Sequence, residues 1–239
     1  MAAVAAVAAL VPTACGSIAG DAAGSSGPGG GPAAPATTGA PPAAGASSTP
    51  PSVGPTVRER LAVLRVDDRP TPIGRYRRED WPHWDDVDGN GCDTRQDALL
   101  RWTTTTPTLD PGRRCKVVSG TWVSPYDGAV ATTPAEVEID HVVPLAEAFR
   151  SGGWQWEAGL RRRFANDPAE VVPVSSRSNR SKGDDTPDEW RPSRVEAWCA
   201  YAERYLTVKA TYDLTVTTSE RDALGQMLDT CGPDSDAWP

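Results

Sequence analysis

VEIDHVVPL, at residues 137–145, is the stretch of sequence that decides the fold. Its β-branched residues favour a strand, and the polar pair Asp140–His141 falls near the end of that strand. Pro144 then suits the start of a helix, because proline fixes the backbone dihedral φ and has no N–H that would need a partner. The stretch therefore predicts a strand that delivers two polar side chains to the start of a helix.

A second polar segment, SNRSKGD at residues 178–184, supplies complementary groups. Asp140 offers an anionic oxygen, and His141 offers a nitrogen base that titrates near neutrality. Asn179 adds a neutral oxygen, and Lys182 adds a cation. Hydrolysis of a phosphodiester needs a base, a place for a metal ion and positive charge near the phosphate. The two segments together therefore predict a phosphodiester hydrolase.

With DHVVP and NRSK at this separation, the chain resembles the HNH nucleases, and among them the GmrSD-like branch. The two segments also look like the HNH domain of CRISPR effector nucleases. The resemblance implies a ββα-metal fold, with the Asp–His pair on the first strand and an asparagine near the start of the helix. It implies that His141 is the general base and that Asp140 and Asn179 bind one divalent ion. It further implies that Lys182 is a cation on the phosphate side.

Two features of the motif need an explanation. Glu170 stands where the family has its middle asparagine, which braces the backbone of the motif. Asn166 or another group must supply this brace, or the brace is lost. In addition, successive strand residues point to opposite faces, yet Asp140 and His141 must serve one site. A twist or a bulge at the strand end would bring both side chains there.

The expected ligands favour a hard metal ion. A carboxylate oxygen and an amide oxygen suit Mg²⁺, which keeps several waters, and Mn²⁺ is the expected substitute. A zinc site with three histidines is impossible, because the chain has two histidines. The second one, His83, lies among tryptophans and is typical of a packed aromatic neighbour. An unperturbed histidine titrates near pH ~6.5, so cleavage by His141 is expected to rise with pH through that region.

The acidic stretch WDDVDGNGCD, at residues 84–93, is a candidate for a second metal. Asp86, Asp88 and Asn90 alternate as the oxygen ligands of calcium loops do, but the glutamate of such loops is absent. The stretch is therefore either a structural Ca²⁺ site or an acidic turn that is held by Cys92.

The net charge of −8 does not favour a protein that coats nucleic acid by bulk electrostatics. An enzyme needs only a local basic groove, and we expect Arg180, Arg177 and Arg163 to contribute to substrate binding. The alternative for Arg163 is that the arginine triplet at 161–163 forms a solvated helix face. The predicted partner is nucleic acid, with DNA as the expected form, and the chain is expected to be a monomer.

Composition divides the chain into three parts. Residues 1–15, MAAVAAVAALVPTAC, resemble the end of a secretory signal that leads into a lipobox-like Cys15. Residues 16–56 are almost entirely Ala, Gly, Pro, Ser and Thr, which predicts a disordered linker. Residues 57–239 hold all nine tryptophans and form the expected nuclease domain. We expect a secreted protein or a cell-surface lipoprotein that meets the membrane through Cys15; the alternative is a cleaved signal peptide without lipid.

Four further cysteines lie in the domain. An even number of cysteines in an exported chain predicts two disulfides. The rival interpretation is zinc, but the domain has no C-x-x-C pair. We favour the pairs Cys92–Cys115 and Cys199–Cys231, because each closes a local segment.

Local patterns predict the remaining elements. Capping-box patterns predict helices after Thr56, Asp93, Ser193 and Thr217. The run CKVVSGTWV at 115–123 predicts a β-hairpin. The expected fold is α+β, with a small β-hairpin and a ββα-metal core that is surrounded by helices and stapled by disulfides.

A second functional class competes with the nuclease. It is a non-enzymatic, calcium-stabilised envelope lipoprotein that retains the HNH fold, and the departure at Glu170 is the feature that supports it. A plasmid-nicking assay with and without EDTA separates the two.

Overall fold

The structure, a computed structural model, describes residues 56–232 and 238–239. The predictions for the signal-like segment, for Cys15 and for all but the last residue of the linker lie outside the described residues. The α-helices are α1 Val57–Val63, α2 Thr94–Trp102, α3 Leu145–Arg150, α4 Ala158–Ala165, α5 Ser176–Lys182, α6 Trp198–Thr211 and α7 Thr218–Leu228. The strands are β1 Thr108–Leu109, β2 Val117–Ser119, β3 Trp122–Val123, β4 Val130–Ala131, β5 Val137–His141 and β6 Val171–Ser175. Short 3₁₀ helices are η1 Arg78–Asp80, η2 Pro134–Glu136, η3 Gly153–Gln155 and η4 Val195–Ala197.

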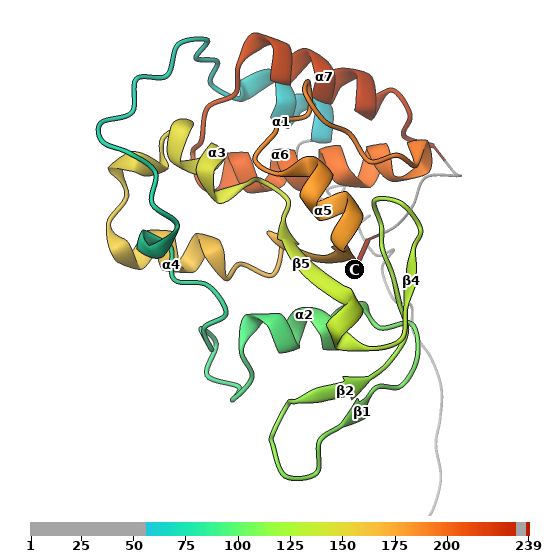
Figure 1. Ribbon diagram of the computed structural model, residues 1–239. Helices are drawn as coiled ribbons and strands as arrows, with labels where there is room; N and C mark the ends of the chain where they lie inside the picture. Colours follow the sequence, from blue (N-terminus) through green and yellow to red (C-terminus); the bar gives the residue numbers. More distant parts are fainter. Residues whose placement is uncertain (1–55, 233–237) are drawn as a thin grey trace, which may run out of the picture. The chain divides into compact units, whose positions relative to one another are not determined.

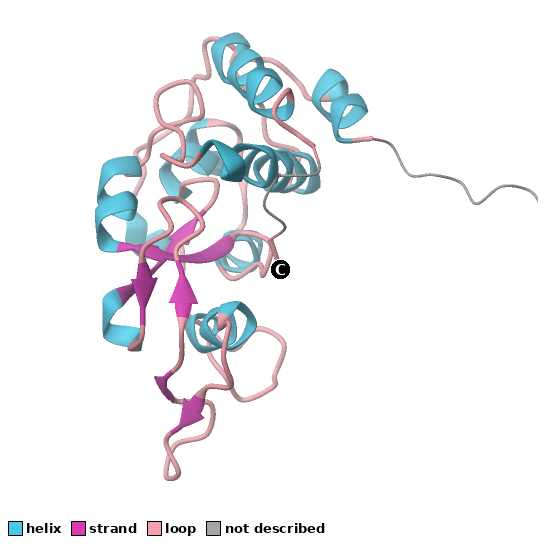
Figure 2. Cartoon of the chain, turned by 90° about the vertical axis from the view of Figure 1, so that its right-hand side faces the viewer, coloured by secondary structure: helices cyan, strands magenta, loops and turns pink. Residues whose placement is uncertain are grey.

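The strands form three antiparallel pairs, β1 with β2, β3 with β4 and β5 with β6. Figure 2 shows these pairs in the lower half of the view, with most of the helices above them. The chain runs from β6 directly into α5, which contacts both β5 and β6 and lies beside β5 in Figure 1. The small amount of sheet confirms the α+β prediction.

Helices α1, α6 and α7 contact one another. Along α6, Tyr201, Tyr205 and Leu206 recur at helical spacing and are completely buried, so this helix is a central part of the core. Within the described ranges, every helix is too short or too polar to span a bilayer.

The helix starts at Thr56, Asp93 and Thr217 are confirmed, because each cap side chain accepts a hydrogen bond from a backbone amide of the first turn. The start predicted at Ser193 is wrong. Helix α6 begins only after η4 and has no side-chain cap, while the Ser193 hydroxyl donates to the carbonyl oxygen of Tyr126 over 3.3 Å.

The hairpin predicted over residues 115–123 is also wrong. Its two runs become β2 and β3, but each pairs with another strand. The residues between them bond elsewhere: Gly120 N donates to Thr132 O, and Thr121 O accepts from Thr104 N. Residues 120 and 121 therefore connect β2 to β3, which belong to different strand pairs, and do not form the turn of a hairpin.

Both predicted disulfides are confirmed. Cys92 and Cys115 have Cα atoms 5.3 Å apart, and Cys199 and Cys231 have Cα atoms 4.9 Å apart. The first joins the acidic stretch to the segment before β2. The second joins the first turn of α6 to the residues after α7.

Candidate active site

The candidate site lies where α5 packs on β5. Glu138 and Asp140 are two residues apart and share one face of β5, whereas Asn179 and Lys182 are three apart and share one face of α5. These faces meet. Asn179 Nδ2 donates to Glu138 Oε2 over 2.7 Å, and Lys182 Nζ lies 3.0 Å from Asp140 Oδ2. The fold therefore joins the two polar segments that the sequence separates.

His141 is the last residue of β5 and is almost fully buried. Its Nε2 lies 2.8 Å from the carbonyl oxygen of Ala165, which can only accept, so Nε2 carries the proton and Nδ1 keeps its lone pair. The ring of Trp84 stacks on the imidazole, with centroids 5.7 Å apart. Burial lowers the pKa of His141 to about 3, and the Ala165 carbonyl opposes this shift. The imidazole is therefore neutral at pH 7 and can accept a proton.

Asp140 and Lys182 form a buried ion pair. Tyr126 Oη donates to Asp140 Oδ2 over 2.8 Å, and Lys182 Nζ also donates to the carbonyl oxygen of His141 over 2.8 Å. Burial raises the pKa of Asp140, while Lys182 and the Tyr126 hydroxyl act to lower it. Lys182 is completely buried, so it contacts Asp140 from the protein interior.

A cavity of about 440 Å³ is lined by Asp140, His141 and Asn179, so three of the predicted catalytic residues reach one space. Asp140 and His141 bond to different partners on opposite sides of β5, as strand alternation requires. They share the cavity because it lies at the strand end, where Pro144 and the first residues of α3 also line it. The pairing of β5 with β6 has no register shift, so the suggested bulge is absent.

Glu170 supplies the brace that the sequence left unassigned. Its carboxylate oxygens accept from Val143 N at 3.1 and 3.3 Å, and its carbonyl oxygen accepts from Val142 N at 2.7 Å. Burial raises its pKa well above the usual range. Glu170, which stands where the family has asparagine, therefore holds the backbone that directly follows Asp140 and His141.

Asn166, the other candidate for the brace, holds a different loop. Its Oδ1 accepts from Asp85 N at 2.9 Å, and its Nδ2 donates to Pro82 O over 2.8 Å. Thr94 Oγ1 donates to the same Oδ1 over 2.9 Å. Asn166 therefore fixes the segment that carries Trp84 over His141.

The predicted substrate-binding arginines do not line this cavity. Arg180 follows Asn179 on α5 and lies 3.8 Å from a carboxylate oxygen of Glu138. Arg177 lines a separate cavity, beside Trp190, and Arg163 is exposed on α4. Their roles remain predictions.

The acidic stretch at 84–93 forms turns. Asp86 accepts from Gly89 N and Gly91 N, and Asn90 Nδ2 donates to Asp88 Oδ2 over 3.0 Å. These bonds account for the acidic turn, and the Ca²⁺ site at Asp86, Asp88 and Asn90 remains a prediction.

Three residues at the site were not identified from the sequence. Glu138 could have been identified, because it alternates with Asp140 along the strand, whereas Tyr126 and Arg78 carried no signal. Tyr126 lies in an irregular segment, and Arg78 lies in η1; Tyr126 bonds Asp140, and Arg78 lines the cavity.

The donors fit a hard divalent ion. Asn179 donates through its Nδ2 to Glu138, so Oδ1 is the atom of this side chain that would coordinate the ion. Each carboxylate oxygen of Asp140 has two lone pairs and can accept a hydrogen bond and bind an ion as well. In the described ranges, the one cluster of three potential His, Cys or acidic ligands is Cys199, Glu203 and Cys231. Its two cysteines are bound to each other, so it does not offer a thiolate zinc site.

Comparison with known proteins agrees with a nuclease site. Residues 93–227 match the family described as GmrSD restriction endonucleases, C-terminal domain. The chain belongs to this family, which indicates a nuclease-type function, a nucleic acid substrate and a need for a divalent metal.

A relative from Arthroderma benhamiae, named "Uncharacterized secreted protein", is 40% identical over 188 residues. The match covers 77% of this chain and 89% of the relative. No solved structure matches the chain.

Proposed function

We propose that this protein is an HNH-type endonuclease that hydrolyses phosphodiester bonds of nucleic acid outside the cytoplasm, with DNA as the expected substrate. One observation carries the proposal. The Ala165 carbonyl holds His141 by Nε2, which leaves Nδ1 available as a base beside the cavity that Asp140 and Asn179 also line.

His141 takes a proton from the attacking water. Its lowered pKa keeps the ring unprotonated at pH 7, and the same burial makes it a weaker base than an ordinary histidine. Once the ring is protonated, the Ala165 carbonyl stabilises the imidazolium, since this carbonyl is the contact that raises the pKa. The hydrogen bond also fixes the ring plane, so the same group orients the base and supports its charged form.

Asp140 and Asn179 would hold Mg²⁺, for which Mn²⁺ can substitute, through a carboxylate and an amide oxygen. When bound, the ion supplies positive charge for the phosphate and for the leaving 3′ oxygen. Products with 5′ phosphates follow from that polarity. Asn179 is oriented by its hydrogen bond to Glu138, whose pKa is lowered by hydrogen bonds from Ser176 and Asn179.

Lys182 is best explained as a positioning residue. The sequence suggested a phosphate-side cation, but its Nζ is fully buried and bonds Asp140 and the His141 carbonyl. It therefore favours the ionised form of Asp140, against the effect of burial, and holds the strand end in place. A side-chain cation on the phosphate side must therefore come from another residue.

Export is the third part of the proposal. The two disulfides suit an oxidising compartment, and the relative from Arthroderma benhamiae is named a secreted protein. Lipidation at Cys15 remains a prediction. The non-enzymatic alternative loses its sequence support, because Glu170 bonds the motif backbone that it was expected to leave unbraced.

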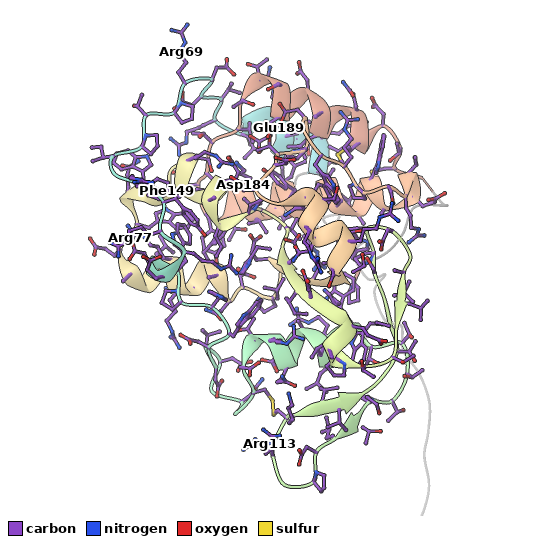
Figure 3. All side chains as sticks on the ribbon, viewed as in Figure 1. Arg69, Arg77, Arg113, Phe149, Asp184 and Glu189 are labelled. Carbon is purple, nitrogen blue, oxygen red and sulfur yellow. A yellow bond between two sulfur atoms is a disulfide. The ribbon has the colours of Figure 1, made fainter. Side chains whose placement is uncertain are left out.

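Cleavage of supercoiled plasmid by the purified full chain tests the proposal. We expect nicking with Mg²⁺ or Mn²⁺ and none with EDTA, and loss of nicking in Asn179→Ala and Asp140→Ala. Arg113→Ala, in the loop between β1 and β2, is the control that keeps activity (Figure 3). Matched single-stranded, duplex and RNA substrates then define the preference. Absence of cleavage of every substrate with both metals would rule the proposal out.

A further inference from the structure

Part of the cavity wall comes from outside the matched family segment. Tyr76 and Arg78 line the cavity beside Asp140 and His141, yet both precede residue 93, where the match to the family begins. Arg78 is the only cation among the described residues that line it. The remaining charges of the wall are the carboxylates of Asp140 and Asp184.

Arg78 is exposed and directed toward the site. Its Nη2 lies 3.5 Å from His83 Nε2, and the residue lines the cavity beside Asp140 and His141. Within the described ranges no carboxylate is paired with it. The neighbouring Arg77 behaves differently, because its Nε donates to Glu79 Oε1 over 2.9 Å. Arg77 also lies at the outer margin of the view in Figure 3.

His83 contacts the guanidinium group of Arg78. Its Nδ1 lies 2.9 Å from the Trp81 carbonyl oxygen, which can only accept, so Nδ1 carries the proton and Nε2 accepts from Arg78. Trp81 is buried and packs against Trp156 and Phe164. A chain of contacts therefore runs from the core through His83 to the guanidinium group.

We propose that Arg78 binds a backbone phosphate of the substrate at the cavity, and that His83 is the residue that positions Arg78. This inference rests on the proposed nuclease function, since it identifies the cation that the buried Lys182 does not provide. A guanidinium group offers paired N–H donors that match two phosphate oxygens, and Arg78 is exposed and has no carboxylate partner among the described residues. The segment before the family match thus completes the substrate side of the site.

Kinetics on a defined duplex test the contact. Arg78→Ala should lower kcat/KM about 10- to 100-fold, mainly through KM, because it removes a charge-assisted hydrogen bond. Arg78→Lys should restore part of this loss, since it keeps the charge but not the fork. Arg77→Ala is the matched control and should stay within about twofold of the wild type. Equal kcat/KM in the wild type and Arg78→Ala would overturn the proposal.

Binding separates this inference from the proposed function. With a fluorescein-labelled duplex in EDTA, Arg78→Ala should reduce the slope of log Kd against log salt by ~0.9, the effect of one lost phosphate contact, whereas Arg77→Ala should not. A wild type that fails to cleave contradicts the proposed function alone. An unchanged slope in Arg78→Ala contradicts the role of Arg78, even if the wild type cleaves.

Two His83 variants test the positioning role. His83→Leu removes the acceptor and should raise KM in the direction of Arg78→Ala, whereas His83→Gln offers an acceptor oxygen and should restore most of the affinity. In the Arg78→Ala background, His83→Leu should have no further effect on KM, because its action passes through Arg78. Additive effects of the two substitutions would show that His83 does not act through Arg78.

Discussion

Lys182 and Lys209 are both completely buried, and each has a carboxylate partner, but they lie in regions of different character. Lys182, on α5, has one carboxylate, Asp140, and caps the carbonyl oxygen of His141. Lys209, on α6, lies 2.7 Å from Glu147 and 3.1 Å from Glu220.

The cavities beside these lysines differ in charge. Asp140 faces a cavity with a histidine, an amide and Arg78. Glu147 and Glu220 face another, whose described lining holds one cation, Arg150, against seven carboxylates and no histidine. These seven are Asp67, Glu147, Asp184, Asp185, Asp188, Glu189 and Glu220; Asp184 and Glu189 are labelled in Figure 3. Such a surface repels a polyanion, so of these two cavities the one beside Lys182 suits a nucleic acid better.

A buried lysine–carboxylate pair is therefore not a mark of function by itself. Such pairs recur as structural ties, and removing one partner leaves an uncompensated charge in the core. The Lys182 region differs because it contains His141, whose Nδ1 keeps its lone pair and whose side chain lines a cavity.

The largest expected effect is on turnover, in the Lys182 region alone. His141→Ala should lower the cleavage rate by about 10²- to 10⁴-fold, the usual contribution of a general base, and should leave duplex binding intact. Plasmid cleavage and fluorescence anisotropy measure the two. Tyr205→Phe, which removes the hydroxyl that donates to Glu220 over 2.6 Å, is the control in the Lys209 region and should cut normally. A His141→Ala variant that still turned over would make this histidine a bystander.

Removing either lysine should destabilise the fold, but only one change should affect chemistry. Lys182→Met and Lys209→Met should each lower the free energy of unfolding by about 3–5 kcal/mol, because the first leaves Asp140 and the second leaves Glu220 buried without a cation. Urea unfolding measures this. Below the melting temperature, Lys182→Met should lose most of its cleavage rate and Lys209→Met should keep it. Equal loss of activity in both variants would contradict a role for Lys182 in catalysis that Lys209 does not share.

The sequence was informative where the signal is local. Caps at Thr56 and Thr217 depend on residues three positions apart, and both disulfides close short segments, so these features were predictable. The chemistry of Asp140 and His141 was also readable, because it needs particular residue types. The resemblance predicted a ββα core; β5, β6 and α5 occur in that order, with α3 and α4 between the two strands.

Features that depend on distant contacts could not be read. The segment with Gly120 looks like a turn, but its backbone bonds to residues far along the chain. The sequence left the brace of the motif unassigned, because a sequence does not show that the carboxylate of Glu170 reaches Val143 N. The burial that moves the pKa of His141, and that encloses Lys182, likewise comes from packing of the whole domain.

The disulfide between Cys199 and Cys231 ties together the helices of the Lys209 region. Cys199→Ser/Cys231→Ser should lower the free energy of unfolding by about 3–4 kcal/mol through loop-closure entropy, with cleavage by the folded protein unchanged. Calorimetry and plasmid cleavage measure the two.

The intact protein should also lose four hydrogens relative to its reduced form in mass spectrometry, since it contains two disulfides. Four free thiols in protein from an oxidising compartment would contradict the export prediction.

The two regions should respond to acid with opposite signs. The folded pKa of His141, about 3, lies below the unfolded value of ~6.5, so the unfolded chain binds a proton first and stability is lost as pH falls through this window. Between pH 7 and 5 the loss should be about 2 kcal/mol. Burial raises the pKa of Glu220, so its contribution is present at low pH and lost as pH rises. Urea unfolding of His141→Gln at both pH values should lack the His141 loss, and Glu220→Gln should retain it.

The smallest expected effect is on the pH dependence of cleavage. An ordinary histidine would give a rise through pH ~6.5, but burial lowers the pKa of His141 to about 3, so its neutral fraction hardly changes above pH 5. A bound cation would lower that pKa further and keep the same sign. At saturating Mg²⁺ the rate should therefore vary less than about threefold from pH 5.5 to 8, and the initial rate of plasmid nicking measures it. Arg113→Ala should give the same profile. A tenfold rise between pH 6 and 7 would mean that His141 is solvated in the working enzyme, and the enclosed site with Trp84 stacked on the base would then have to open before it acts.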